Sequence, residues 1–260
     1  MTRLALGLEY NGAAFSGWQT QPNGVGVQDA VESALAAFVQ TAVATTCAGR
    51  TDAGVHATYQ VIHIDAPVER PLASWVRGVN RFLPRTVAVR WARFVPESFH
   101  ARFDARLRRY DYWLVNDSVR SPLADRRAGW VFRPLDETAM QRAAAQLVGM
   151  HDFTSFRAAE CQAASPVREL RELSVQRFGH RIRVRAVANA FLHHMVRNLV
   201  GTLVYVGTGR HGPEWAREVL AARDRAVAAP TFAAAGLYLT GVEYDPALDL
   251  PAPIDAVPVF

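Results

Sequence analysis

Two spacings of apolar residues alternate along the first half of the chain. Period-two spacing over 4–10 predicts a strand, and helical spacing over 27–38 predicts an amphipathic helix. A second round follows, with a strand near 59–64, a helix near 72–82 and a strand near 86–94. The first half is therefore expected to have the order β-α-β-α-β.

The second half repeats this order with a longer helix. Strands are expected near 106–115, 169–177, 181–188 and 236–242, and helices near 136–147, 191–206 and 213–220. The fold class expected is α+β, with two similar RRM-like or ferredoxin-like units, residues 1–104 and 105–260. Their antiparallel sheets are expected to join into one extended sheet, with the active-site cleft between the units.

Composition indicates an ordinary globular protein. Half of the 260 residues are apolar, which is enough for a sizeable core, and no apolar run reaches the length of a membrane span. The first ten residues do not read as a signal peptide, so a cytoplasmic location without a membrane partner is expected. Cys47 and Cys161 are too few for a disulfide framework and lack zinc-ligand spacing.

The charge points to a polyanionic partner. The net charge is +5, and all 29 basic residues are arginines, which excludes a Schiff-base lysine and a P-loop lysine. Nine arginines fall between Arg77 and Arg109, interleaved with aromatic residues from Trp91 to Trp113. This combination suits phosphate contact and base stacking. A coding bias toward arginine accounts for the same composition, and both explanations stay open.

A candidate catalytic carboxylate is Asp52. Gly49 and Gly54 flank it, and Thr51 can hydrogen-bond locally, as expected where a backbone turns tightly and presents one side chain. An aspartate that serves only as a turn or N-cap residue would occupy the same kind of loop. The loop by itself therefore leaves the role of Asp52 undecided.

Arg197 is the second candidate, because it is predicted to lie in the middle of the apolar helix 191–206. A guanidinium buried there is costly unless a carboxylate meets it. Asp52 is the partner expected for catalysis. Structural pairing with Glu9, Asp29 or another acid, or a side chain that reaches the surface, is the alternative.

Motifs along nearly the whole chain resemble the tRNA pseudouridine synthase A (TruA) family. The markers are Leu8–Gly12, Gly17–Gln19, Val27–Gln28, Ala48–Ala57, Asn80, Leu83–Pro84, Phe99–Phe103, Arg108–Tyr110, His151–Phe153, Phe156–Arg157, Phe191–Gly201 and Gly236–Leu239. Two departures are His193, where the family usually has Tyr or another residue before the helix histidine, and Thr231–Ala235 in place of the usual Pro-Ala. The second departure affects a wall of the expected site, not its chemistry.

The resemblance implies a homodimeric enzyme that isomerises uridine to pseudouridine at positions 38, 39 and 40 of the tRNA anticodon stem-loop, without cofactor or metal. It places the catalytic aspartate at Asp52 and the uridine-contacting tyrosine at Tyr110. The loop arginine of the family falls on Arg50 and the helix arginine on Arg197.

The chemistry of such a reaction fits these residue types. The N1–C1′ bond breaks and C5 joins C1′, so an ionised carboxylate beside the ribose acts as a nucleophile at C1′ or as a base at C2′, and the sequence leaves both open. A cation such as Arg197 favours the charged form of Asp52. Extrusion of the nucleotide requires a stacking partner, which suits Tyr110, and a side chain that fills the gap, which suits Arg50. Because Tyr110 shares a strand face with Tyr112, core packing is the alternative for either.

Two other functions are alternatives. A non-catalytic RNA-binding protein would use the same arginines without needing a pair of Arg197 and Asp52. A metal-dependent hydrolase would use the adjacent His193 and His194, but successive helical residues point about 100° apart and no third ligand follows at a matching position. No metal site is therefore expected, and capping, packing or RNA contact is expected for the two histidines.

Overall fold

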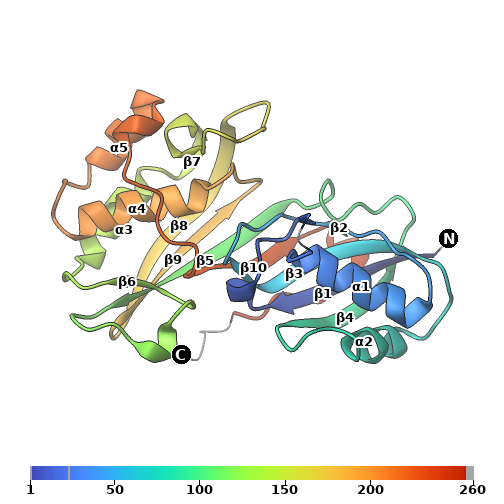
Figure 1. The fold of residues 1–260 in the computed structure, drawn as a ribbon. Coiled ribbons are helices and arrows are strands. Elements are labelled where there is room, and N and C mark those ends of the chain that lie inside the picture. Colours follow the sequence, from blue (N-terminus) through green and yellow to red (C-terminus); the bar gives the residue numbers. More distant parts are fainter. Residues whose placement is uncertain (1, 23, 256–260) are drawn as a thin grey trace. The chain divides into compact units, whose positions relative to one another are not determined.

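The computed structural model describes residues 2–22 and 24–255, which form two mixed α/β units (Figure 1). Unit 1 contains the described chain up to Leu107 and again from Tyr238, and unit 2 contains Arg108–Leu237. The α+β class and the two similar units are thus confirmed. None of the helices in the described part of the chain combines the length and apolar composition needed to cross a membrane.

The sheet of unit 1 has the order β4-β1-β3-β10, with the short β2 beside β3. The strands are β1 (Thr2–Tyr10), β2 (Thr46–Cys47), β3 (His56–Ala66), β4 (Val87–Val95) and β10 (Leu237–Glu243). β1 pairs antiparallel with β3 and β4, whereas β10 pairs parallel with β3 through Tyr238↔His56 and Leu239↔Ala57. The predicted strands 59–64 and 86–94 correspond to β3 and β4.

Strand β1 is buried on both faces over most of its length. The alternating residues that predicted it, such as Leu4 and Leu6, are fully buried, but Ala5 between them is fully buried as well. At Gly7 the indole of Trp91 takes the place of a side chain, since a Cβ there would lie 2.1 Å from that ring. Neighbouring strands on each side and cover on each face make β1 the centre of unit 1.

Two helices of unit 1 pack against each other through aromatic rings. These helices are α1 (Val27–Val39) and α2 (Leu72–Asn80), with the bounds predicted to within a few residues. Phe38 meets the fully buried Trp75 edge-to-face, with ring centroids 5.3 Å apart, a favourable geometry for two aromatic quadrupoles. Pro71 stands immediately before α2, where its missing N–H costs nothing.

Unit 2 repeats the pattern with a sheet in the order β5-β9-β8-β7, and the short β6 pairs parallel with β5. Its strands are β5 (Leu107–Asn116), β6 (Gly129–Val131), β7 (Gly149–Asp152), β8 (Val167–Phe178) and β9 (Arg181–Ala188). Its helices are α3 (Glu137–Ala145), α4 (Met195–Gly207) and α5 (Trp215–Ala222). The predictions missed β2, β6 and β7, which are too short to show a period.

A buried ion pair ties β5 to β9 inside unit 2. Asp111 and Arg185 stand opposite each other in the strand register, and two guanidinium nitrogens of Arg185 donate to the two carboxylate oxygens over 2.7 and 2.8 Å. The side chains are 1% and 11% exposed. A two-pronged contact of this kind satisfies both buried charges.

The two units do not match the predicted ranges 1–104 and 105–260, because the chain passes between the units twice. The first crossing, after Leu107, lies close to the predicted boundary at Asp104. The second crossing was not anticipated, because β10 returns to unit 1 and pairs with β3. Parallel pairing between such distant segments leaves no local signal in the sequence.

We predict that the stability of unit 1 falls below pH 6.5 because of His63. Its ring is 7% exposed, Nδ1 accepts a hydrogen bond from Ala101 N over 3.0 Å, and burial lowers the pKa from 6.5 to about 4. The unfolded chain therefore binds a proton between pH 6.5 and 4 that the folded chain excludes, which removes up to about 3 kcal/mol across this range. Urea unfolding as a function of pH measures the effect.

The matched control is His63→Asn, which keeps an acceptor for Ala101 N but does not titrate. This variant should show a flatter pH dependence between 6.5 and 4. Equal pH dependence in the variant and the wild type would rule out His63 as the cause.

Candidate active site

Asp52 lies in a tight turn between β2 and β3. Val55 N donates to Asp52 O over 3.1 Å, and Gly54 has φ +78°, a conformation that glycine adopts without strain. The Asp52 side chain is half-buried, whereas Ala53 at the tip of the turn is exposed. The glycine at 54 thus has the turn role that the sequence predicted.

The segment after β1 holds this turn by hydrogen bonds. Trp18 N donates to Thr51 O over 2.9 Å, and Gly54 N donates to Phe15 O over 3.3 Å. The hydroxyls of Tyr10 and Thr51 lie 2.9 Å apart in a buried hydrogen bond. Hydrogen bonds therefore reach the turn at residues on both sides of Asp52.

Two glycines let the backbones approach this closely. A Cβ at Gly12 would lie 1.9 Å from Val55 O, and a Cβ at Gly17 would lie 2.8 Å from Thr51 O. Gly17 also has φ +100°. Beyond the turn, His56 Nδ1 accepts from Gly12 N over 3.0 Å. No other residue type fits at either glycine without displacing the turn.

Gln60 supports the loop from the opposite end. Its side chain is fully buried, and Nε2 donates to Gly49 O over 2.6 Å. The sequence analysis did not single out Gln60, although an amide among the mostly apolar residues 59–64 is a signal that could have done so. Arg50, directly after Gly49, is exposed, so its guanidinium is accessible to a ligand.

In unit 2, Tyr110 and Tyr112 differ although they share a face of β5. Tyr112 is fully buried and its hydroxyl donates to Ala233 O over 2.7 Å, so Tyr112 is a core residue. Tyr110 is 8% exposed and meets Phe191 edge-to-face at 5.1 Å. Tyr112 is therefore a core residue, as the alternative interpretation held. Tyr110 instead packs against Phe191, in the segment that leads into α4.

The start of α4 was predicted wrongly. The helix begins at Met195, not at Phe191, because His194 has φ +61° and interrupts the helical backbone. Arg197 therefore lies in the first turn of α4 and not in its middle. It is half-buried, and its Nε donates to Phe232 O over 2.8 Å.

This position of Arg197 has an electrostatic consequence. The N-terminus of a helix carries a partial positive charge, and a cation in the first turn opposes it. A negative group near the guanidinium removes that repulsion. The local arrangement therefore favours an anion, whether a carboxylate or a phosphate.

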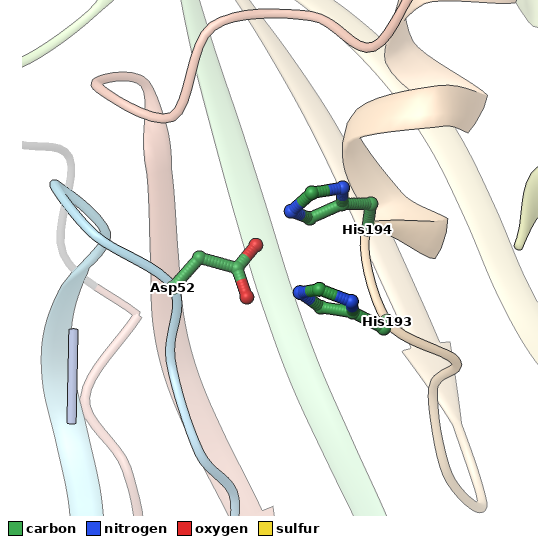
Figure 2. A group of neighbouring side chains, drawn as sticks. All are labelled: Asp52, His193 and His194. Atoms are coloured by element: carbon green, nitrogen blue, oxygen red, sulfur yellow. The ribbon is translucent and has the colours of Figure 1, made fainter. Parts of the chain in front are cut away.

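His193 and His194 lie before α4 and share one side of the chain. Figure 2 shows their rings, with Asp52 on its separate loop in unit 1. The two ring centroids are 4.0 Å apart, so the argument that helical spacing separates these side chains is wrong. Two adjacent imidazoles can supply metal ligands, and the expectation of no metal stays a prediction that rests on the reaction chemistry.

Most arginines of the stretch 77–109 are exposed, whereas its aromatic residues are partly exposed and partly buried. Phe94 and Phe103 are 51% and 74% exposed, and the Arg102 guanidinium lies 5.8 Å from the Phe103 ring centroid. Phe99, in contrast, is 2% exposed and belongs to the core. Only part of the predicted basic and aromatic set is therefore available for stacking on a ligand.

Comparison with known proteins identifies close relatives over nearly the whole chain. A family model described as tRNA pseudouridine synthase matches residues 8–104 and 143–245. The chain is 58% identical over 249 residues to tRNA pseudouridine synthase A of Methylibium petroleiphilum, covering 96% of each. It is 56% identical over 253 residues to tRNA pseudouridine synthase A of Herminiimonas arsenicoxydans, covering 96% of this chain and 92% of the relative. The protein of the same name from Burkholderia lata is 55% identical over 257 residues, covering 98% of this chain and 95% of the relative.

We predict that Gly17→Ala displaces the Asp52 turn, whereas Gly24→Ala does not. Both glycines have positive φ, so both variants carry the same kind of backbone strain, but a Cβ at Gly24 meets no atom within 4 Å. The steric conflict at Thr51 should cost Gly17→Ala about 1–3 kcal/mol more in unfolding free energy. Urea unfolding, with amide exchange of Trp18 N–H as a local probe, measures this difference. Equal losses in both variants would show that the close approach is unimportant.

Proposed function

The chain belongs to the tRNA pseudouridine synthase family, and we propose that its target uridines are positions 38, 39 and 40 of the tRNA anticodon stem-loop. The predicted family and its isomerase activity on tRNA are confirmed. The assignment of Asp52 as the catalytic group rests on one observation: this carboxylate projects from a turn that backbone hydrogen bonds hold in place. A group held this firmly is prepared for its task before substrate binds.

The reaction defines what Asp52 must do. The N1–C1′ bond of uridine breaks, the freed uracil turns, C5 bonds to C1′, and the hydrogen of C5 leaves as a proton. An ionised carboxylate beside the ribose starts this sequence by attack at C1′ or by removal of the C2′ proton. Either act requires a well-placed carboxylate, and the hydrogen-bonded turn fixes the backbone from which that carboxylate projects.

Arg197, Tyr110 and Arg50 complete the proposed set. The guanidinium of Arg197 supports the ionised Asp52 carboxylate during the reaction, since a cation favours the charged form. The Tyr110 ring contacts the extruded uracil. Arg50, which is exposed on the Asp52 loop, occupies the space that the nucleotide leaves in the RNA.

A non-catalytic RNA-binding role is disfavoured. Binding alone needs no carboxylate on a buried hydrogen-bond scaffold, and an acidic group facing RNA weakens attraction to phosphates. The homodimer and the cytoplasmic location expected from the sequence belong to the same proposal. Gel filtration coupled to light scattering tests the dimer directly.

We predict tritium release from anticodon stem-loops that carry C5-tritiated uridine at position 38, 39 or 40. The new C5–C1′ bond displaces the C5 hydrogen, so release counts turnovers. Stem-loops tritiated at another loop uridine are the control and should release nothing. A chelator should leave the rate unchanged, because no step requires a metal. Release only from other uridines would contradict the proposed positions, and loss of release with chelator would contradict the metal-free mechanism.

We also predict that Arg197→Met slows single-turnover isomerisation on the order of 100-fold, because the carboxylate loses its supporting cation. Arg217→Met, which removes an exposed arginine from α5, is the matched control and should retain the wild-type rate. Arg197→Lys should recover part of the rate. If Arg197→Met folds and reacts as fast as the wild type, Arg197 has no part in the reaction.

A further inference from the structure

Arg157 and Arg168 stand at the two ends of the loop that joins η3 (Thr154–Phe156) to β8. Arg157 directly follows η3, Arg168 is the second residue of β8, and main-chain carbonyls hold both side chains. Arg157 Nη2 donates to Cys161 O over 2.5 Å. Arg168 Nη1 donates to Ser165 O and Val167 O over 2.9 and 2.6 Å. These bonds fix both guanidinium groups before any ligand binds, so little side-chain entropy is left to lose on binding.

Neither guanidinium is paired with a carboxylate among residues 2–22 and 24–255. Other arginines of unit 2 are paired, such as Arg177 with Glu137 at 2.9 Å and Arg171 with Glu169 at 3.3 Å. Within the loop itself, Glu160 is exposed and makes no ion pair. The charges of Arg157 and Arg168 are therefore not neutralised by an ion pair within the described residues.

One nitrogen donor of these two arginines is also buried without a hydrogen-bond partner. Arg168 Nε is inaccessible to solvent and makes no hydrogen bond in the described structure. Burial, together with the nearby charge of Arg157, lowers the pKa of Arg168. Two positive charges near each other, one of them partly buried, are costly unless an opposite charge offsets them, and the ligand that does so is an anion.

We propose that Arg157 and Arg168 bind a phosphodiester of the RNA substrate. The planar guanidinium donates two parallel hydrogen bonds to phosphate oxygens, and two such groups match the several oxygens of one phosphodiester. This inference rests on the proposed function, because an RNA substrate supplies the phosphate.

The loop between η3 and β8 is hydrogen-bonded to the segment that leads into α4, so a phosphate bound by Arg157 and Arg168 would lie near that segment. Ala158 N donates to His193 O over 3.0 Å, and His193 N donates to Cys161 Sγ over 3.4 Å. The loop between η3 and β8 thus both donates a hydrogen bond to His193 and accepts one from it, and His193 stands two positions before α4. A phosphate held here fixes the RNA backbone against the segment that carries Arg197.

Phosphate-ethylation interference on the anticodon stem-loop tests the proposal with the full-length protein. Ethylation neutralises single phosphates, and those that the protein contacts appear as positions where ethylation blocks binding. Arg168→Gln and Arg157→Gln should each lose interference at the same one phosphate. The plot of log Kd against log salt concentration should become shallower by roughly 0.7 to 0.9. Arg142→Gln, which removes an exposed charge on α3, should keep the whole pattern.

A bracing role alone would give a different result. If the arginines only support the loop, the glutamine variants lose thermal stability and the interference pattern stays complete, which overturns the proposal. Arg168→Lys covers the case in which Arg168→Gln does not fold, because it keeps the charge and should keep the interference.

Three further outcomes would overturn the proposal. Stabilisation of wild type but not Arg168→Gln by inorganic phosphate, with an unchanged RNA pattern, would assign the site to a free anion. Wild-type protein that releases tritium from the stem-loop while both glutamine variants keep the full pattern would refute this site and leave the proposed function intact. Absence of both RNA binding and tritium release would refute the two together.

Discussion

The backbone of residues 12–18 lies so close to the turn at Asp52 that no side chain fits between them. Gly12 and Gly17 allow the approach, and the bonds from Trp18 N to Thr51 O and from Gly54 N to Phe15 O fasten it. The position of the Asp52 backbone, and with it the point from which the carboxylate projects, follows from this contact. Everything proposed for the reaction depends on a carboxylate that points in one direction before the substrate arrives.

The polar groups around the turn strengthen the same constraint. Tyr10, Thr51 and Gln60 are buried, and their hydrogen bonds join the first strand, the loop and β3. A buried network whose members are hydrogen-bonded is rigid, since moving one member leaves others without partners. The loop therefore behaves as part of the sheet of unit 1, although its residues have no regular secondary structure.

Sequence spacing predicted the long strands and helices well, because their apolar periods are local. It failed where an unusual backbone conformation sets the start of a helix, or where strands far apart in sequence pair. His194 has a left-handed conformation without being glycine or asparagine, so nothing in the pattern announced that α4 begins at Met195. The parallel pairing of β10 with β3 joins residues far apart in sequence. Asp52 and the glycines around it were readable as a motif, whereas the supporting role of Gln60 needed the structure.

The arginines of unit 2 show the same limit, because a sequence without lysine presents every cation as one residue type. Only the ion-pair and hydrogen-bond partners seen in the structure distinguish arginines that stabilise the fold from arginines available to a ligand. Arg185 is satisfied by Asp111 in the sheet, while Arg157 and Arg168 have main-chain carbonyls and no acid in the described chain. Paired arginines stabilise the fold, and arginines held ready without an acid are suited to RNA.

The most direct test of the account is single-turnover isomerisation by Asp52→Asn, measured beside tRNA affinity and the melting temperature. Asparagine has the shape of aspartate, so the turn and its hydrogen bonds should persist, with wild-type stability and RNA binding, while formation of pseudouridine should become undetectable. Isomerisation by Asp52→Asn at a rate near that of the wild type would contradict the central claim that this clamped carboxylate performs the reaction.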